Sequence, residues 1–182
     1  MARARVKNTG KPRAGNDYHR CDKCGQSITE GQKRYEWSFR YGGTYTRHVS
    51  CGAPRQSETT QGNISQLYAA GEDVEDAVAV DEPTEVDDFE GWRDGIAEAL
   101  TQAAETAREL GSEYEAAAEP FGGQGANQER YEACDGWADE LEDAASTVSG
   151  VEVQPVDDPD DDPLADAIQE VRDAAESPSL QL

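Results

Sequence analysis

Three cysteines and one histidine form two pairs with the same internal spacing. Cys21 and Cys24 are separated by two residues, and His48 and Cys51 repeat that spacing after a spacer of 23 residues. Thiolate sulfur and imidazole nitrogen are ligands that zinc prefers, and two such pairs supply the four donors of a tetrahedral site. Four protein ligands leave no open coordination position for a catalytic water. We therefore expect one structural Zn²⁺ ion held by these four residues.

The spacer must bring the two pairs together, and its pattern predicts a β-hairpin. From Arg34 to Tyr41, aromatic residues alternate with polar ones, which is typical of a half-buried strand. We expect Gly42-Gly43 to form a two-residue turn. Reflecting the strand about that turn places Trp37 opposite His48, so the histidine is expected on the aromatic face. The same reflection pairs Phe39 with Thr46 and Arg40 with Tyr45, and it places Arg34, Arg40, Tyr45 and Arg47 on the other face.

Three residues near the first pair have simpler expected roles. Gly25 can take the open backbone conformation that lets amides approach the second sulfur. Ile28 is the nearest apolar side chain and is expected to pack beneath the pair. His19 is a further candidate ligand, but four ligands already exist, so we expect a surface or packing role for it.

The arrangement Cys21-x2-Cys24, aromatic strands, His48-x2-Cys51 resembles the poly(ADP-ribose) polymerase-type zinc finger. The shared features are the ligand order and an isoleucine soon after the first pair, here Ile28. The resemblance covers about residues 18–55, with a spacer shorter than is usual in that family. It implies DNA binding, notably at breaks and ends. Nothing in the chain resembles the polymerase's catalytic domain.

Charge divides the 182-residue chain into two parts. Residues 1–55 hold twelve Lys or Arg against four Asp or Glu, a balance of +8, and residues 56–182 hold four against thirty-five, a balance of −31. A basic segment beside a zinc module suggests binding of nucleic-acid phosphates, so DNA or another nucleic acid is the expected partner. Residues 1–17 are expected to be a disordered basic arm, with a solubilising tail as the alternative. The candidate nucleic-acid contacts are Arg34, Arg40, Tyr41, Tyr45, Arg47 and Arg55.

The remainder of the chain predicts helices and acidic linkers. Residues 56–86 are expected to be an acidic linker with a short helix that starts after Asn63 and ends before Gly71. Residues 87–149 predict an antiparallel helical hairpin, its helices capped by Asp87 and Asn127 and separated by Pro120 and glycines. An acidic linker at 150–162 and a short helix at 163–176 capped by Asp162 follow. The expected fold class is α+β, a small zinc-bound β-hairpin module followed by acidic helices and disordered linkers.

Cys134 lies on the predicted apolar stripe and is expected to be a buried thiol without a metal. The chain contains no phosphate-binding glycine motif, and both histidines lie beside the predicted zinc site, so we expect no enzyme. The alternative function is a protein-interaction adaptor, in which the acidic helices bind a partner or mask the basic segment.

Excess acid and scarce lysine would also suit a protein kept soluble in high salt, as in halophilic archaea or their viruses, and high genomic GC content would give a similar bias. No apolar run long enough for a membrane helix exists, and no secretory signal is evident. The expected location is therefore the cytoplasm, or the host cytoplasm for a viral protein.

Overall fold

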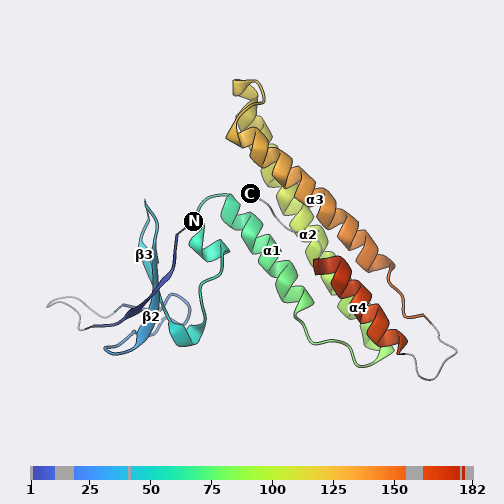
Figure 1. Cartoon of the computed structure of the whole chain (residues 1–182), viewed down its shortest axis with the longest axis horizontal. Coiled ribbons are helices and arrows are strands. Elements are labelled where there is room, and N and C mark those ends of the chain that lie inside the picture. Colours follow the sequence, from blue (N-terminus) through green and yellow to red (C-terminus); the bar gives the residue numbers. More distant parts are fainter. Residues whose placement is uncertain (1, 11–18, 41, 155–161, 177, 179–182) are drawn as a thin grey trace. The chain divides into compact units, whose positions relative to one another are not determined.

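The computed structural model describes residues 2–10, 19–40, 42–154, 162–176 and 178 (Figure 1). The chain divides into two compact units, Met1–Tyr68 and Ala69–Leu182. The first unit contains a three-stranded antiparallel sheet, and the second consists of helices. The predicted α+β class is therefore confirmed. In the part of the chain that is described, no helix combines the length and the apolar character needed to cross a membrane.

The sheet has the order β1-β2-β3, and its first strand was not expected. Strand β1 (Arg5–Asn8) pairs antiparallel with β2 (Lys33–Ser38), with Arg5 opposite Glu36 and Asn8 opposite Lys33. The prediction of a disordered arm is therefore wrong for residues 5–8. Its part from residue 11 to residue 17 lies outside the described residues. The pairing makes the basic segment an integral part of the sheet.

The register of β2 with β3 (Thr44–His48) differs from the predicted one by three residues. Trp37 lies opposite Tyr45, and Arg34 lies opposite His48. The cause is the connection, which runs over residues 39–43 rather than being a two-residue turn. Because side chains alternate between the two faces of a strand, an odd shift exchanges the faces. The expectation that His48 shares the aromatic face is therefore wrong: Arg47 and Tyr45 share the face of Trp37, and His48 shares that of Arg34.

The aromatic face of the sheet is closed by the segment after Cys51. The indole Nε1 of Trp37 donates a hydrogen bond of 3.2 Å to the carbonyl of Glu58, in the 3₁₀ helix η2 (Ser57–Thr59). The backbone N–H of Ala2 donates to the carbonyl of Thr59 at 2.6 Å. Trp37 is thereby almost completely buried. The residues just after the second ligand pair therefore belong to the fold of the first unit, although they were expected to be linker.

Helix α1 (Ile64–Val78) occupies much of the predicted acidic linker. Gly71 was expected to end a short helix, but it lies inside α1. A Cβ atom at position 71 would be 3.8 Å from the ring of Trp137, which is an ordinary van der Waals distance, so a small side chain would fit there. Gly71 therefore does not end the helix.

Helices α2 (Val86–Ala118) and α3 (Ala126–Gly150) pack against one another in opposite directions (Figure 1). The short 3₁₀ helix η3 (Glu119–Phe121) lies in their connection. The guanidinium of Arg93 donates a 2.9 Å hydrogen bond to the carbonyl of Val151, while Gly111 lies beside Cys134. The residues of α2 buried by this packing follow the three- and four-residue steps of the predicted stripe; they include Phe89, Ile96, Leu100, Ala103, Ala107 and Leu110.

The predicted starts of these two helices are wrong in detail. Glu85 precedes α2 and Gly125 precedes α3, and neither makes a side-chain capping hydrogen bond. Asp87 and Asn127, the expected capping residues, lie inside the first turns instead. An acidic residue in the first turn still interacts favourably with the helix dipole, which suits Asp87 at its observed place.

Helix α4 (Pro163–Glu176) has the predicted bounds. Asp162 precedes it, and its carboxylate accepts the N–H of Ala165 at 3.1 Å, which is the predicted cap. The helix packs against α2 and α3 and buries Ile168 and Val171. In the preceding predicted linker, residues 155–161 lie outside the described residues.

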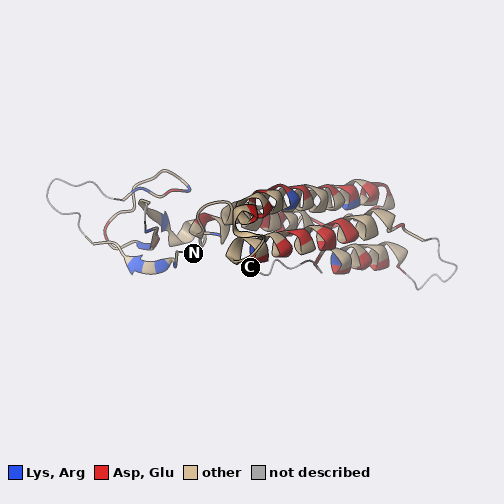
Figure 2. Ribbon diagram, turned by 90° about the horizontal axis from the view of Figure 1, so that it is seen from above, with Lys and Arg blue, Asp and Glu red and all other residues tan. Residues whose placement is uncertain are grey.

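Acidic residues recur along the helices of the second unit, whereas Lys and Arg gather in the first (Figure 2). Each described arginine of the second unit connects two of its segments. Arg108 of α2 pairs with three acidic residues of α3. The other connections are Arg93 to Val151, Arg130 over the ring of Tyr114, and Arg172 to Glu82. The cations therefore join helices together, and the surplus charge of this unit is negative.

Candidate metal centre

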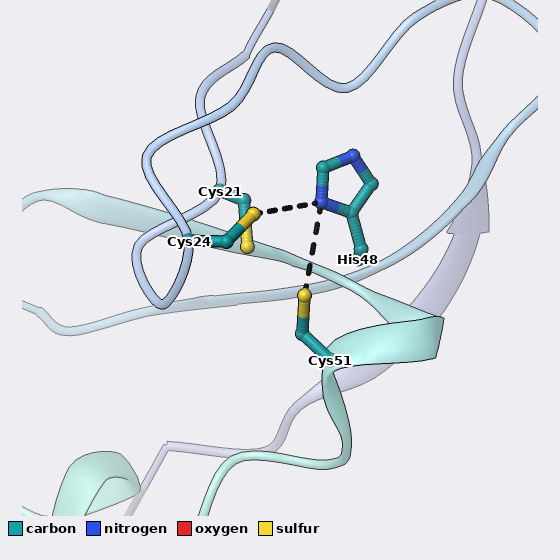
Figure 3. Close-up of side chains that lie close together, drawn as sticks. All are labelled: Cys21, Cys24, His48 and Cys51. Carbon is teal, nitrogen blue, oxygen red and sulfur yellow. Dashed lines mark hydrogen bonds between the residues drawn. The ribbon is translucent and has the colours of Figure 1, made fainter.

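Cys21, Cys24, His48 and Cys51 come together at the edge of the sheet (Figure 3). Their four ligand atoms, three sulfurs and one ring nitrogen, all lie within 4.8 Å of one another. His48 Nδ1 is 3.5 Å from the sulfur of Cys24 and 4.0 Å from that of Cys51. This is the group of residues predicted from the two spacings. The cluster could bind a single metal ion.

The first ligand pair lies on a tight turn held by backbone hydrogen bonds. The N–H of Cys21 donates to the carbonyl of Gln26 at 2.8 Å, and the N–H of Gly25 donates to the carbonyl of Cys21 at 2.9 Å. Gly25 has a φ of +72°, which side-chain-bearing residues rarely adopt. Ile28 is fully buried, as predicted. The turn therefore holds both sulfurs on one side of the backbone.

The second ligand pair is formed where β3 ends. His48 is the last residue of the strand, and the 3₁₀ helix η1 (Val49–Cys51) follows it directly. This single turn reverses the chain and brings Cys51 back towards the imidazole. Gly52 ends the turn with a φ of +88° and donates its N–H to the carbonyl of Val49 at 3.2 Å. Strand and turn together place the second pair opposite the first.

The four ligands differ in their exposure to solvent. Cys21 and His48 are buried, Cys51 is half-buried and Cys24 is exposed. Burial raises the pKa of the Cys21 thiol, but backbone N–H groups of Cys24, His48 and Lys23 outweigh burial and lower that pKa to about 6. Desolvation, together with the neighbouring sulfurs of Cys24 and Cys21, raises the pKa of Cys51 to about 11. The neighbouring sulfurs thus oppose ionisation of Cys51, and a bound cation would relieve that repulsion.

The donor set and its spacing fit zinc. With Zn–S bonds near 2.3 Å and Zn–N bonds near 2.0 Å, the sulfur and nitrogen donors of a tetrahedral site are about 3.5 Å apart. The observed 3.5 and 4.0 Å separations between sulfur and Nδ1 are close to that value. Three thiolates and one imidazole are soft ligands that favour zinc over magnesium or calcium. In this arrangement His48 would bind through Nδ1. His19, the further candidate, is exposed and does not belong to the cluster.

Two arginines predicted to contact nucleic acid are used inside the first unit. Arg34 is 8% exposed and donates to the carbonyl of Asn8, to Thr9 Oγ1 and to the carboxylate of Glu36. Arg47 is 4% exposed and bonds two carboxylates. Burial of this kind is a property of tertiary packing, so alternation along a strand did not reveal it. Neither guanidinium lies on the surface of the unit.

The other predicted contacts lie on the surface of the unit or outside the described residues. Arg40 and Arg55 are exposed, and Tyr45 is 43% exposed. The ring of Tyr45 stacks on Trp37 with centroids 5.7 Å apart and meets the ring of Phe39 edge-on. Tyr41 lies outside the described residues. Among the residues described near the β2–β3 connection, Tyr45 thus offers an exposed ring whose orientation is set by Trp37 and Phe39.

Sequence reasoning missed Asp22 and Glu58, the two carboxylates that bind Arg47. Asp22 lies between the two ligands of the first pair, and Glu58 lies in η2. An acidic residue between paired cysteines is a weak signal by itself. Its importance depends on a contact with a residue 25 positions away.

No family model, no curated protein and no solved structure matches the chain. The ligand spacing and the geometry of the cluster are therefore the two features that indicate a metal site.

Proposed function

We propose that the protein is a non-enzymatic zinc protein whose first unit binds nucleic acid. The observation that carries the zinc part is the Cys₃His cluster, with its four ligand atoms within 4.8 Å. Four protein ligands complete a tetrahedral shell, so the ion would stabilise the fold rather than activate water. The ligand order is that of the poly(ADP-ribose) polymerase-type finger, and we propose the same structural use of the metal here.

Cobalt(II) substitution tests the metal site directly. Bound by three thiolates and one imidazole, cobalt should give intense sulfur-to-metal charge-transfer absorption at one equivalent per chain, and added zinc should remove it. The matched variants are Cys24→Ser, which removes a ligand, and Cys134→Ser, which removes a distant thiol. Equal spectra for Cys24→Ser and the unsubstituted chain would contradict the proposed ligand set.

The nucleic-acid part of the proposal is supported by charge and by exposed groups of the first unit. Arg3, Arg5, Arg40 and Arg55 are exposed there, and phosphates are their natural partners. Tyr45 supplies a ring whose orientation is already set by Trp37, so little side-chain entropy would be lost when a base stacks on it. Arg34 and Arg47 are no longer proposed as nucleic-acid contacts, because their guanidinium groups are buried and hydrogen-bonded inside the first unit. Tyr41 stays a predicted contact.

Fluorescence anisotropy with the full chain tests this part. Labelled single-stranded and double-stranded DNA and RNA of equal length are titrated at several salt concentrations. The proposal expects binding that weakens as salt rises, because each neutralised phosphate releases counterions. If none of the oligonucleotides binds in a salt-dependent manner, nucleic-acid binding is wrong for this protein.

Two substitutions at one position test stacking. Tyr45→Ala removes the ring and should weaken binding by about 1–3 kcal/mol, roughly 5- to 150-fold. Tyr45→Phe keeps the ring and its contact with Trp37, so it should bind nearly as well as the unsubstituted chain. Equal affinities for the two variants would exclude stacking on Tyr45.

The second candidate is an adaptor in which the acidic unit binds a basic partner or masks the basic unit. It is favoured by one observation: the described arginines of the second unit already connect its own segments, so its surplus charge is negative. Residues 1–68, once shown to hold the same zinc content as the full chain, provide the comparison. Masking predicts tighter oligonucleotide binding by residues 1–68. Equal affinity would exclude masking.

A further inference from the structure

Arg47 is a buried arginine that forms ion pairs with Asp22 and Glu58 beside the candidate metal ligands. Its Nε and Nη2 donate to the two carboxylate oxygens of Asp22, each at 2.9 Å. Its Nη1 donates to Glu58 Oε2 at 2.9 Å, and Nη2 forms a further ion pair with Glu58. The guanidinium also lies over the ring of Trp37, 5.6 Å from the centroid. Glu58, and then Asp22, raise the pKa of Arg47, so the group stays charged.

Two partners of Arg47, Asp22 and Ala53, belong to the segments that carry the ligands. Asp22 lies between Cys21 and Cys24. Arg47 itself directly precedes His48. On the other side of Cys51, the carbonyl of Ala53 lies 3.5 Å from Nη1. The guanidinium of Arg47 therefore contacts the segment of Cys21 and Cys24 and the segment of Cys51, and Arg47 itself belongs to the strand that ends at His48.

Burial of Arg47 makes the fold sensitive to the loss of its carboxylate partners. A guanidinium that is 4% exposed destabilises the fold when its carboxylates are removed, because a buried charge is left unpaired, whereas the side chains of Asp22 and Glu58 are 24% and 37% exposed. The planar fork of arginine can bond Asp22 and Glu58 at the same time, which a lysine ammonium cannot do with the same geometry. The contacts hold the first ligand pair against β3 independently of any metal ion.

We propose that Arg47 is a positioning residue for the metal centre: it holds the segments of Cys21, Cys24, His48 and Cys51 at ligand distance and so raises metal affinity without touching the metal. The inference rests on the proposed zinc site. Side chains that orient metal ligands from outside typically change metal affinity about 10- to 100-fold when they are removed. A preorganised site binds more tightly because less ordering remains to be done when the ion enters.

Arg34 provides the matched control. It is a buried arginine of the same sheet, 8% exposed, with hydrogen bonds to a carboxylate, a hydroxyl and a backbone carbonyl. The hydrogen-bond partners of its side chain are Glu36, Thr9 and Asn8, and none of them belongs to a ligand-bearing segment. Its backbone is paired with that of His48 in the sheet, and this pairing is kept when the side chain is replaced. Replacing either arginine by methionine removes a buried charge and its bonds. Only Arg47→Met removes side-chain hydrogen bonds that connect the ligand-bearing segments with one another.

The test is a zinc competition titration of the full chain against a chromophoric chelator, together with the unfolding free energy of each zinc-loaded variant. The expected result is a rise in the zinc Kd of about 10- to 100-fold for Arg47→Met and a much smaller rise for Arg34→Met at comparable loss of stability. Asp22→Asn should raise the Kd as well. Because Asp22 and Arg47 act through one contact, the rise in zinc Kd of the double variant Asp22→Asn/Arg47→Met should be smaller than the product of the two single rises.

Arg47→Lys keeps the inference testable if Arg47→Met does not fold with zinc. Lysine keeps the charge but loses the two-carboxylate fork, so the Kd should still rise above that of Arg34→Met. A Kd for Arg34→Met that rises as much as the Arg47 variants would overturn the inference, because general stability would then set affinity. Absence of zinc from the unsubstituted chain would instead contradict the zinc site itself.

Discussion

Among single residues, Cys24 and Cys134 show how differently two thiols of one chain are placed. Cys24 is an exposed member of the Cys₃His cluster, whereas Cys134 is buried between helices. Burial also raises the pKa of Cys134, which lowers its thiolate fraction at neutral pH. The two cysteines should therefore react with thiol reagents at very different rates.

This difference gives a prediction for thiol reactivity. With zinc bound, the chain should react slowly with an aromatic disulfide reagent, and after chelation three thiols should react fast. One thiol should still react slowly after chelation, and we assign it to Cys134. This slow phase should be missing in the matched control Cys134→Ala. Fast reaction of all four thiols before chelation would contradict protection by a bound metal.

The four residues of the Cys₃His cluster were predictable because a gap of two residues lets both side chains of a pair face the same metal ion. The roles of Arg34 and Arg47 were not predictable, because each depends on contacts with residues far along the chain. Arg34 reaches Thr9 and Arg47 reaches Asp22 across other strands and turns. Reflecting the strand about a Gly-Gly turn placed both arginines on a solvent face, so two buried arginines were assigned to a partner.

Among the elements, α2 and α3 show close packing at Gly111. A Cβ at this position would lie 3.4 Å from the Cβ of Cys134, whereas a Cβ at Gly95 of the same helix would meet nothing within 4 Å. Gly111→Leu should therefore destabilise the helical unit by about 1–3 kcal/mol through overpacking. Gly95→Ala should stabilise the unit by about 0.5–1 kcal/mol through helix propensity.

Urea unfolding followed by circular dichroism at 222 nm measures both changes. Nearly all helical residues belong to the second unit, so this signal reports on it. The contrast between two glycines of one helix separates packing from backbone entropy. Stabilisation by Gly111→Leu would show that the helices do not approach each other as described.

The cap of α4 gives a local prediction. Asp162 accepts the N–H of Ala165, and Asp162→Ala should cost about 0.5–2 kcal/mol. Because α4 is short, the loss should appear as faster hydrogen exchange along α4 before α2 and α3 are affected. The exposed Asp166→Ala substitution, outside the cap, is the control. Identical exchange in the two variants would exclude the cap.

Periodic helices were predictable from sequence, whereas strand register and strand β1 were not. The stripe from Phe89 to Leu110 follows directly from three- and four-residue steps. The register of β2 with β3 depended on the length of the connection, and a Gly-Gly pair suggested a turn that does not form there. Strand β1 has four exposed residues and no apolar alternation, so only its pairing with β2 defines it.

For the whole molecule, the opposite charges of the two units predict opposite responses to salt. Added salt screens repulsion between the acidic residues of the helices, so the helical unit should become more stable. The same salt should weaken binding of nucleic acid by the first unit. Thermal unfolding at 222 nm and oligonucleotide anisotropy over one salt series measure both responses. A helical unit that loses stability as salt rises would contradict repulsion as its main electrostatic contribution.

The central claim is a single zinc ion bound by Cys21, Cys24, His48 and Cys51, and native mass spectrometry tests it most directly. The full chain expressed with zinc should carry one zinc ion, lose it to a strong chelator and regain it on addition of zinc. Cys24→Ser should reduce zinc occupancy, and Cys134→Ser should leave it at one ion per chain. A chain without zinc, or one whose zinc content is unchanged by Cys24→Ser, would contradict the account.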